Sequence, residues 1–110
     1  MKSYLAAAIQ MTSVPDLQKN LAQAEELIDL AVRQGAELVG LPENFSFMGE
    51  EKDKLAQGNA IAQVTETFLH TMAQRFQVTI LGGGFPIPVD SHSKVYNTAL
   101  LIGTNGQELA

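Results

Sequence analysis

The sequence predicts an α/β fold in the order β-α-β-α-β-β, on three observations. Short apolar runs alternate with segments whose apolar residues recur every three or four positions, the pattern of strands alternating with helices. The 110 residues are 45% hydrophobic and 17% charged, which is the composition of a packed domain. Residues 38–41 are apolar throughout, as in a parallel-sheet strand that is buried on both faces.

The first half of the chain reads as a strand–helix–strand unit. A strand is expected at 3–11 and a helix at 17–34, where Asp16 is a candidate N-cap and Gly35 a candidate C-cap. The helix has one apolar face, and a second strand is expected from about 37 to 41. Strands joined in this way are parallel, with the helix crossing over between them.

In the second half we expect a loop at 44–49, a short helix near 50–54 and a separate amphipathic helix at about 63–76. A strand at 78–81 ends in three glycines, a loop covers 85–93, and another strand covers 94–103. Asn105–Gly106 then predicts a hairpin turn. Only four residues follow this turn, fewer than the five or six that are typical of a strand, so residues 1–110 read as an incomplete domain.

Glu43 is the main candidate for chemistry, because it follows residues 38–41 and Pro42 directly. In open α/β sheets, ligands bind just beyond the carboxyl ends of the strands. A solvated loop carboxylate remains the alternative, since surface acids are common.

Composition excludes several functions. The chain has no cysteine, which rules out disulfides and cysteine metal sites within these residues, and its net charge of −5 without a basic cluster argues against nucleic-acid binding. No signal peptide or membrane-spanning segment is evident, so a cytoplasmic protein is expected.

His70 and His92 have no metal-ligand spacing and are expected to be solvated. Residues 82–84 fail as a nucleotide motif because no helix or Gly-Lys-Ser/Thr sequence follows, and close backbone approach explains them better.

Residues 41–45, with the sequence LPENF, resemble the N-terminal part of the nitrilase superfamily of carbon–nitrogen hydrolases. The first strand, the helix end at 34–37, the strand at 79–84 and the strand at 95–99 agree with that family in order and spacing. The resemblance implies an incomplete α-β-β-α sandwich and a Glu–Lys–Cys triad, of which Glu43 matches the Glu. The Lys and Cys of the family would come after residue 110, and Lys94 does not replace that Lys.

Within that family, residues 45–49 and 82–85 look most like the ω-amidases and deaminated-glutathione amidases. The resemblance implies a small-molecule amide substrate, no metal or cofactor, and a homo-oligomer when the chain is whole. Phe45 and Met48 are candidates for lining an acyl pocket. Asn97 is a candidate for orienting Glu43, although a strand-edge asparagine is an equally good interpretation.

Three hypotheses follow. The first is the N-terminal part of a nitrilase-type amidase that is inactive in isolation. The second is a non-catalytic module that associates with another chain through its open sheet edge. The third, a nucleotide-binding fragment, is the weakest because its motifs fail.

Overall fold

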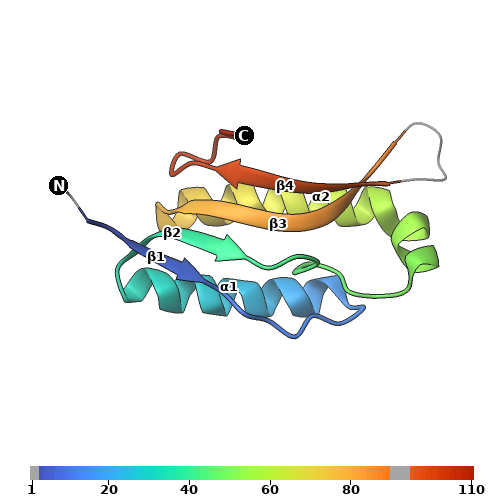
Figure 1. Cartoon of the computed structure of the whole chain (residues 1–110), viewed down its shortest axis with the longest axis horizontal. Coiled ribbons are helices and arrows are strands. Elements are labelled where there is room, and N and C mark those ends of the chain that lie inside the picture. The colour runs from blue at the N-terminus through green and yellow to red at the C-terminus, as the bar shows by residue number, and fades with distance from the viewer. Residues whose placement is uncertain (1–2, 90–94) are drawn as a thin grey trace.

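The computed structural model describes residues 3–89 and 95–110, and it has the element order that the sequence predicts. The elements are β1 (Leu5–Ala8), α1 (Leu17–Arg33), β2 (Ala36–Leu41), α2 (Glu51–Phe76), β3 (Thr79–Pro88) and β4 (Val95–Ile102). The strands form one sheet in the order β1-β2-β3-β4, in which β1, β2 and β3 are parallel and β4 is antiparallel to β3 (Figure 1).

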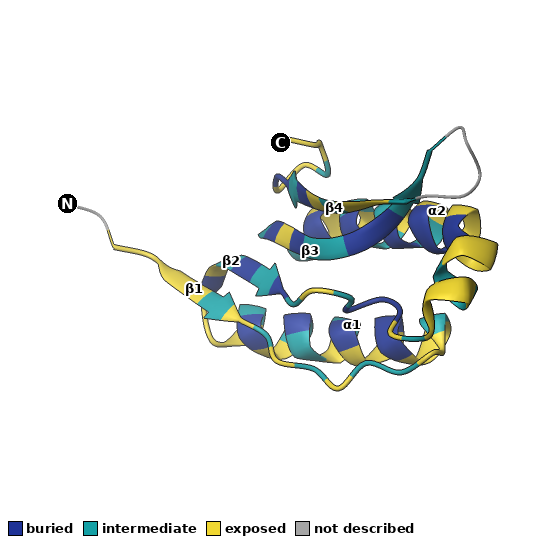
Figure 2. Ribbon diagram, turned by 45° about the vertical axis from the view of Figure 1, so that its right-hand side comes forward, coloured by how far each residue is buried: buried dark blue, intermediate teal, exposed yellow. Residues whose placement is uncertain are grey.

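Both helices lie against the same face of this sheet (Figures 1 and 2). In β2, Val39 and Leu41 are buried beneath the helices, whereas Leu38 and Gly40 are only partly buried. The strand predicted to be covered on both faces is therefore covered on one, because both helices lie on the same side.

The opposite side of the sheet, here called the open sheet face, is apolar, and the described residues leave it uncovered. It is formed by Leu38, Leu81, Leu101 and Tyr4. Leu81 pairs with Leu101, and Leu38 pairs with Thr79, which is two positions before Leu81 on β3. Leu81 is 44% exposed and Tyr4 is 66% exposed. An apolar surface of this kind is typical of an interface.

The ends and the buried stripe of α1 confirm the sequence-based prediction. The Asp16 side chain accepts a hydrogen bond from the Lys19 amide at 3.1 Å, and Gly35 has the left-handed φ of 97° that follows a helix end. Four of the residues expected on the apolar face are buried, namely Leu21, Ala24, Ile28 and Ala31. Leu30, expected to widen that face, is 52% exposed instead.

α2 differs from the prediction, because the expected short helix and the expected second helix are one continuous helix of 26 residues. Gly58 falls in its middle and looks like a break in the sequence. In the structure Gly58 is buried, and a Cβ there would lie 3.1 Å from Pro88 Cγ and 3.5 Å from Val95 Cγ1. The glycine therefore permits close packing of α2 on β3 and β4. Within the described residues, neither helix is long and apolar enough to cross a membrane.

β3 is also longer than predicted, since it continues through the glycines to Pro88, where a loop was expected. Its register against β4 is interrupted between Gly82 and Phe85 and then resumes as far as Pro88 opposite Val95. Its pairing with β2 ends at Gly82, so the outer half of β3 has a strand on one side only. Proline is tolerated in such an edge position, which explains why two prolines do not end the strand.

The turn after β4 forms as predicted, with the Gly106 amide donating to the Gly103 carbonyl at 2.9 Å. The chain then returns along β4, and the Leu109 amide donates to the Leu101 carbonyl at 2.7 Å.

His70 on α2 is not solvated as expected: it is half-buried, and its Nδ1 contacts the carbonyl of Gly106 in the turn after β4. Thus α2 holds this turn in place. The predictions for His92 and Lys94 fall outside the described residues.

Candidate active site

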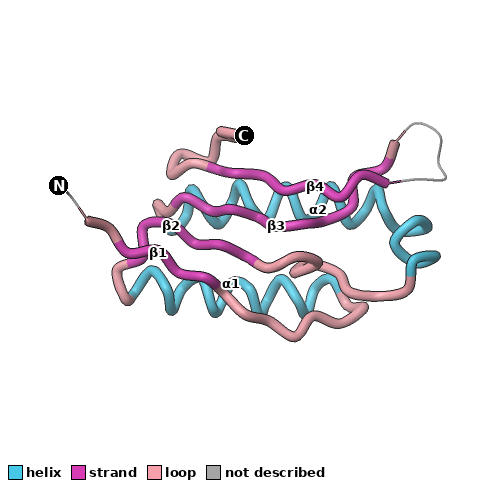
Figure 3. Tube along the Cα trace, viewed as in Figure 1, coloured by secondary structure: helices cyan, strands magenta, loops and turns pink. Residues whose placement is uncertain are grey.

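The candidate site begins where β2 ends, in the loop that connects it to α2 (Figure 3). This loop turns at once, because the Phe45 amide donates to the Pro42 carbonyl at 3.2 Å. Asn44 has a left-handed φ of 58°, a conformation that asparagine tolerates better than most residues, and its amide donates to the Gly84 carbonyl at 2.7 Å. The turn fixes the backbone on both sides of Glu43, whose side chain is exposed.

Glu43 receives a hydrogen bond from β4. The Asn97 Nδ2 donates to Glu43 Oε1 at 3.1 Å, across 54 residues of sequence. This contact joins the end of β2 to β4, which is not its neighbour in the sheet. Asn97 therefore holds one carboxylate oxygen, and the other accepts no hydrogen bond from the described residues.

The contact requires glycine in β3, which lies between β2 and β4. At Gly84, whose φ is +27°, a Cβ would lie 2.6 Å from Glu43 Cγ and 3.0 Å from Asn97 Oδ1. At Gly83, a Cβ would lie 2.6 Å from the Leu41 carbonyl oxygen. Real Cβ atoms do not approach other heavy atoms so closely. The expectation that the glycines permit close backbone approach is confirmed, and what they approach is the segment that carries Glu43.

A second segment, residues 12–16, is joined by hydrogen bonds to the loop that carries Glu43. Asn20 is 1% exposed, and its Nδ2 donates to the Val14 carbonyl at 2.6 Å and to the Ser46 carbonyl at 2.8 Å. The Ser13 hydroxyl donates to the Phe45 carbonyl at 2.9 Å. These bonds tie the loop after β1 to the loop after β2. Figure 3 shows both loops, in pink, beyond the ends of these strands.

A cavity of about 230 Å³ lies beside Glu43. It is lined by two carboxylates, two amides, one ammonium group and two apolar side chains, namely Glu43, Glu51, Asn44, Asn97, Lys54, Val95 and Pro86. Within the described residues, no group of three or more His, Cys, Asp or Glu side chains could hold a metal ion. The described lining residues can therefore accept a proton at a carboxylate and bind polar groups, but none of them is a nucleophile of the Cys or Ser type.

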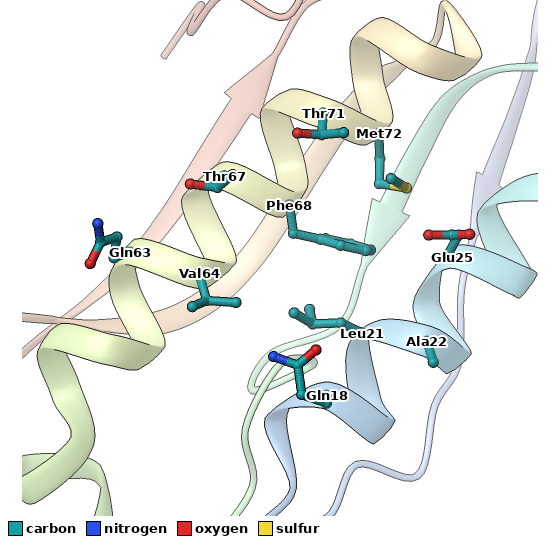
Figure 4. Close-up of a pocket in the computed structure, with 10 residues that line it drawn as sticks. All are labelled: Gln18, Leu21, Ala22, Glu25, Gln63, Val64, Thr67, Phe68, Thr71 and Met72. Carbon is teal, nitrogen blue, oxygen red and sulfur yellow. The ribbon is translucent and has the colours of Figure 1, made fainter.

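A larger cavity of about 530 Å³ lies elsewhere, in a groove between α1 and α2 (Figure 4). Its floor is apolar, with Leu21, Phe68 and Met72, and its carboxylate, Glu25, pairs with Arg75 at 3.3 Å. It contains no set of groups suited to proton transfer or nucleophilic attack. The smaller cavity is therefore the better candidate for chemistry.

The residues named from the sequence fall in different places. Glu43 and Asn97 are together at the cavity. Phe45 is 0% exposed and packs in the core against Phe68, with ring centroids 6.3 Å apart, so its side chain offers no surface to a substrate in this structure. Met48 is 50% exposed and does not line the cavity, and its role stays a prediction.

Two residues at the site were missed. Lys54 was assigned to a short charged helix, although its spacing of three from Glu51 places both on one face of a helix and was a usable signal. Asn20 gave no signal, because an asparagine at a predicted helix start is usually solvated.

A carbon-nitrogen hydrolase family model matches residues 5–110. The chain belongs to the carbon–nitrogen hydrolase family. It is 72% identical over 111 residues to a deaminated glutathione amidase of Synechocystis, covering 100% of this chain and 41% of that protein.

Two solved structures agree with the fold. The NitFhit protein of C. elegans superposes with a TM-score of 0.88 at 29% identity, covering 96% of this chain and 26% of that one. An amidase from Nesterenkonia sp. superposes with a TM-score of 0.82 at 26% identity, covering 96% and 40%. A further structure of the Nesterenkonia amidase carries acrylamide at its active site cysteine. The chain spans about two-fifths of the length of the Synechocystis relative.

Proposed function

We propose that these residues are the N-terminal part of an amidase in which Glu43 is the general base. The observation that carries the proposal is the Asn97–Glu43 hydrogen bond at a cavity beyond the end of a strand, in a chain this similar to a deaminated glutathione amidase. The 110 residues contain no cysteine, so the proposal assigns the Cys and the Lys to a part of the protein beyond residue 110. The whole protein is proposed to be a cytoplasmic homo-oligomer.

The chemistry makes Glu43 accept and return a proton twice, once during acylation and once during hydrolysis of the thioester. It takes the proton of the cysteine thiol, the thiolate attacks the amide carbon, and the lysine stabilises the oxyanion that forms. The tetrahedral intermediate collapses to a thioester and the amine leaves with the proton from Glu43. Glu43 then removes a proton from water, which hydrolyses the thioester to a carboxylic acid and restores the thiol.

A chimera tests this proposal. Residues 1–110 replace the matching segment of the Synechocystis relative, and hydrolysis of deaminated glutathione is measured. The chimera is expected to be active, Glu43→Gln to lower kcat by about 1,000-fold or more, and the 110-residue chain alone to be inactive. The control is Glu26→Gln, which neutralises an exposed acid on α1. Turnover by the isolated chain that Glu43→Gln removes, or an active Glu43→Gln chimera, would overturn the proposal.

A further inference from the structure

Lys54 brings a positive charge to the cavity beside Glu43. It lies in the first turn of α2 and is half-buried, and among the described residues that line the cavity it is the one cation. The two carboxylates of the lining, Glu43 and Glu51, would otherwise leave the cavity with negative charge only.

The lysine is held in place without being neutralised. Its Nζ donates to Asn44 Oδ1 at 3.3 Å, and Asn44 is itself fixed by its amide bond to the Gly84 carbonyl. Within the described part of the chain, no ion pair joins Lys54 to Glu43 or Glu51. An ammonium group has three donors, so two remain for a ligand.

The nearby Lys52 is a useful contrast. Its Nζ pairs with Glu50 Oε2 at 3.5 Å, and its side chain is 79% exposed. It does not line the cavity. The two lysines therefore have the same chemistry and differ in position and pairing.

We propose that Lys54 is a specificity-determining residue that binds a carboxylate of the amide substrate while Glu43 acts at the amide bond. The inference depends on the function proposed above. A carboxylate that reaches the cavity gains both a hydrogen bond from Lys54 and the attraction between opposite charges, whereas a neutral carbonyl in the same position gains only a weaker hydrogen bond. Without Lys54, the charged groups among the described lining residues are Glu43 and Glu51, which repel the carboxylate.

The test compares one substrate in charged and neutral form. In the chimera, kcat/KM is measured for deaminated glutathione and for its dimethyl ester, in which both carboxylates are neutral, by release of the amine. Lys54→Met is expected to lower kcat/KM for the acid by at least about 10-fold, mainly by raising KM. The same variant is expected to change kcat/KM for the ester by less than about 2-fold. Lys54→Arg retains the charge and is expected to recover most of the loss. Lys52→Met is the matched control and should leave both substrates unchanged.

Each other outcome contradicts the inference. If Lys54→Met lowers kcat/KM equally for the acid and the ester, Lys54 has a structural role or acts through Glu43. If Lys54→Met has the same kcat/KM as the unmodified chimera, Lys54 does not take part in substrate recognition. The function is judged separately: if the unmodified chimera hydrolyses neither substrate, the proposed function fails first. If it hydrolyses both and only Glu43→Gln abolishes activity, the function stands while the role of Lys54 fails.

Discussion

Glu43 depends on residues that are far away in the sequence. Asn97 donates to it from β4, and Gly84 leaves the space that its Cγ occupies. The resemblance made Asn97 a candidate for orienting Glu43, with a strand-edge asparagine as an equally good interpretation, and the hydrogen bond between them agrees with the first. The glycine triplet was expected only to permit close backbone approach, and no local pattern shows which segment it approaches. The position of Glu43 just beyond the end of β2 could be predicted, since the carboxylate directly follows an apolar strand.

Gly84→Ala tests this arrangement. The added Cβ would lie 2.6 Å from Glu43 Cγ, so we expect the carboxylate to be displaced and kcat of the chimera to fall by about 100-fold, as for other misplaced catalytic groups. The control is Gly40→Ala in β2, where a Cβ would lie 3.9 Å from the Ala7 carbonyl oxygen and is expected to be tolerated. Wild-type kcat in Gly84→Ala would show that the close approach does not position Glu43.

Among the elements, α1 and β2 were predicted well and α2 and β3 were not. The apolar face and both caps of α1 are local signals, and local signals suffice for a helix of this kind. Two separate helices were expected where α2 is continuous, and a loop was expected where β3 continues through its prolines, but tertiary contacts explain both differences. Gly58 packs against Pro88 and Val95, and these contacts join residues more than 25 positions apart, which no local pattern reports.

The contact between Leu69 of α2 and Gly82 of β3 gives a prediction at this scale. Leu69 is fully buried, so Leu69→Ala is expected to lower the free energy of unfolding by about 2–5 kcal/mol in urea denaturation. Gly82→Ala places a Cβ 2.4 Å from Leu69 Cδ1 and is expected to cost about 1–3 kcal/mol.

The double variant separates packing from other effects. Leu69→Ala makes room for the new Cβ of Gly82→Ala. The double variant should therefore lose less unfolding free energy than the sum of the losses in the two single variants. Leu55→Ala, at a 38% exposed position of the same helix, serves as the control and should have a small effect. Strictly additive losses would contradict direct packing of Leu69 on Gly82.

For the molecule as a whole, the open sheet face decides how the chain behaves alone. The sequence predicted parallel strands buried on both faces and an unfinished domain, and the structure leaves one face of the sheet uncovered. The hydrophobic pattern predicts that something covers that face, but it does not identify the segment or chain that does so. In the proposed whole enzyme, the second sheet of the sandwich packs there. In a stand-alone module, another chain would do so.

The isolated 110-residue chain is therefore expected to self-associate. Leu81 is exposed on the open sheet face, so Leu81→Lys should shift the chain toward the monomer in size-exclusion chromatography with light scattering. Leu30→Lys changes a leucine of similar exposure on α1 and should not have this effect. A wild-type chain that stays monomeric at all concentrations would show that the open sheet face does not drive association.

The central claim is that Glu43 activates the nucleophile, and acylation in a single turnover tests it most directly. The chimera and its Glu43→Gln variant are mixed with limiting amide, and the thioester is followed by the mass of the protein. We predict that Glu43→Gln slows acylation by about 100-fold or more, the usual contribution of a general base. Acylation of Glu43→Gln at the rate of the unmodified chimera would contradict the account.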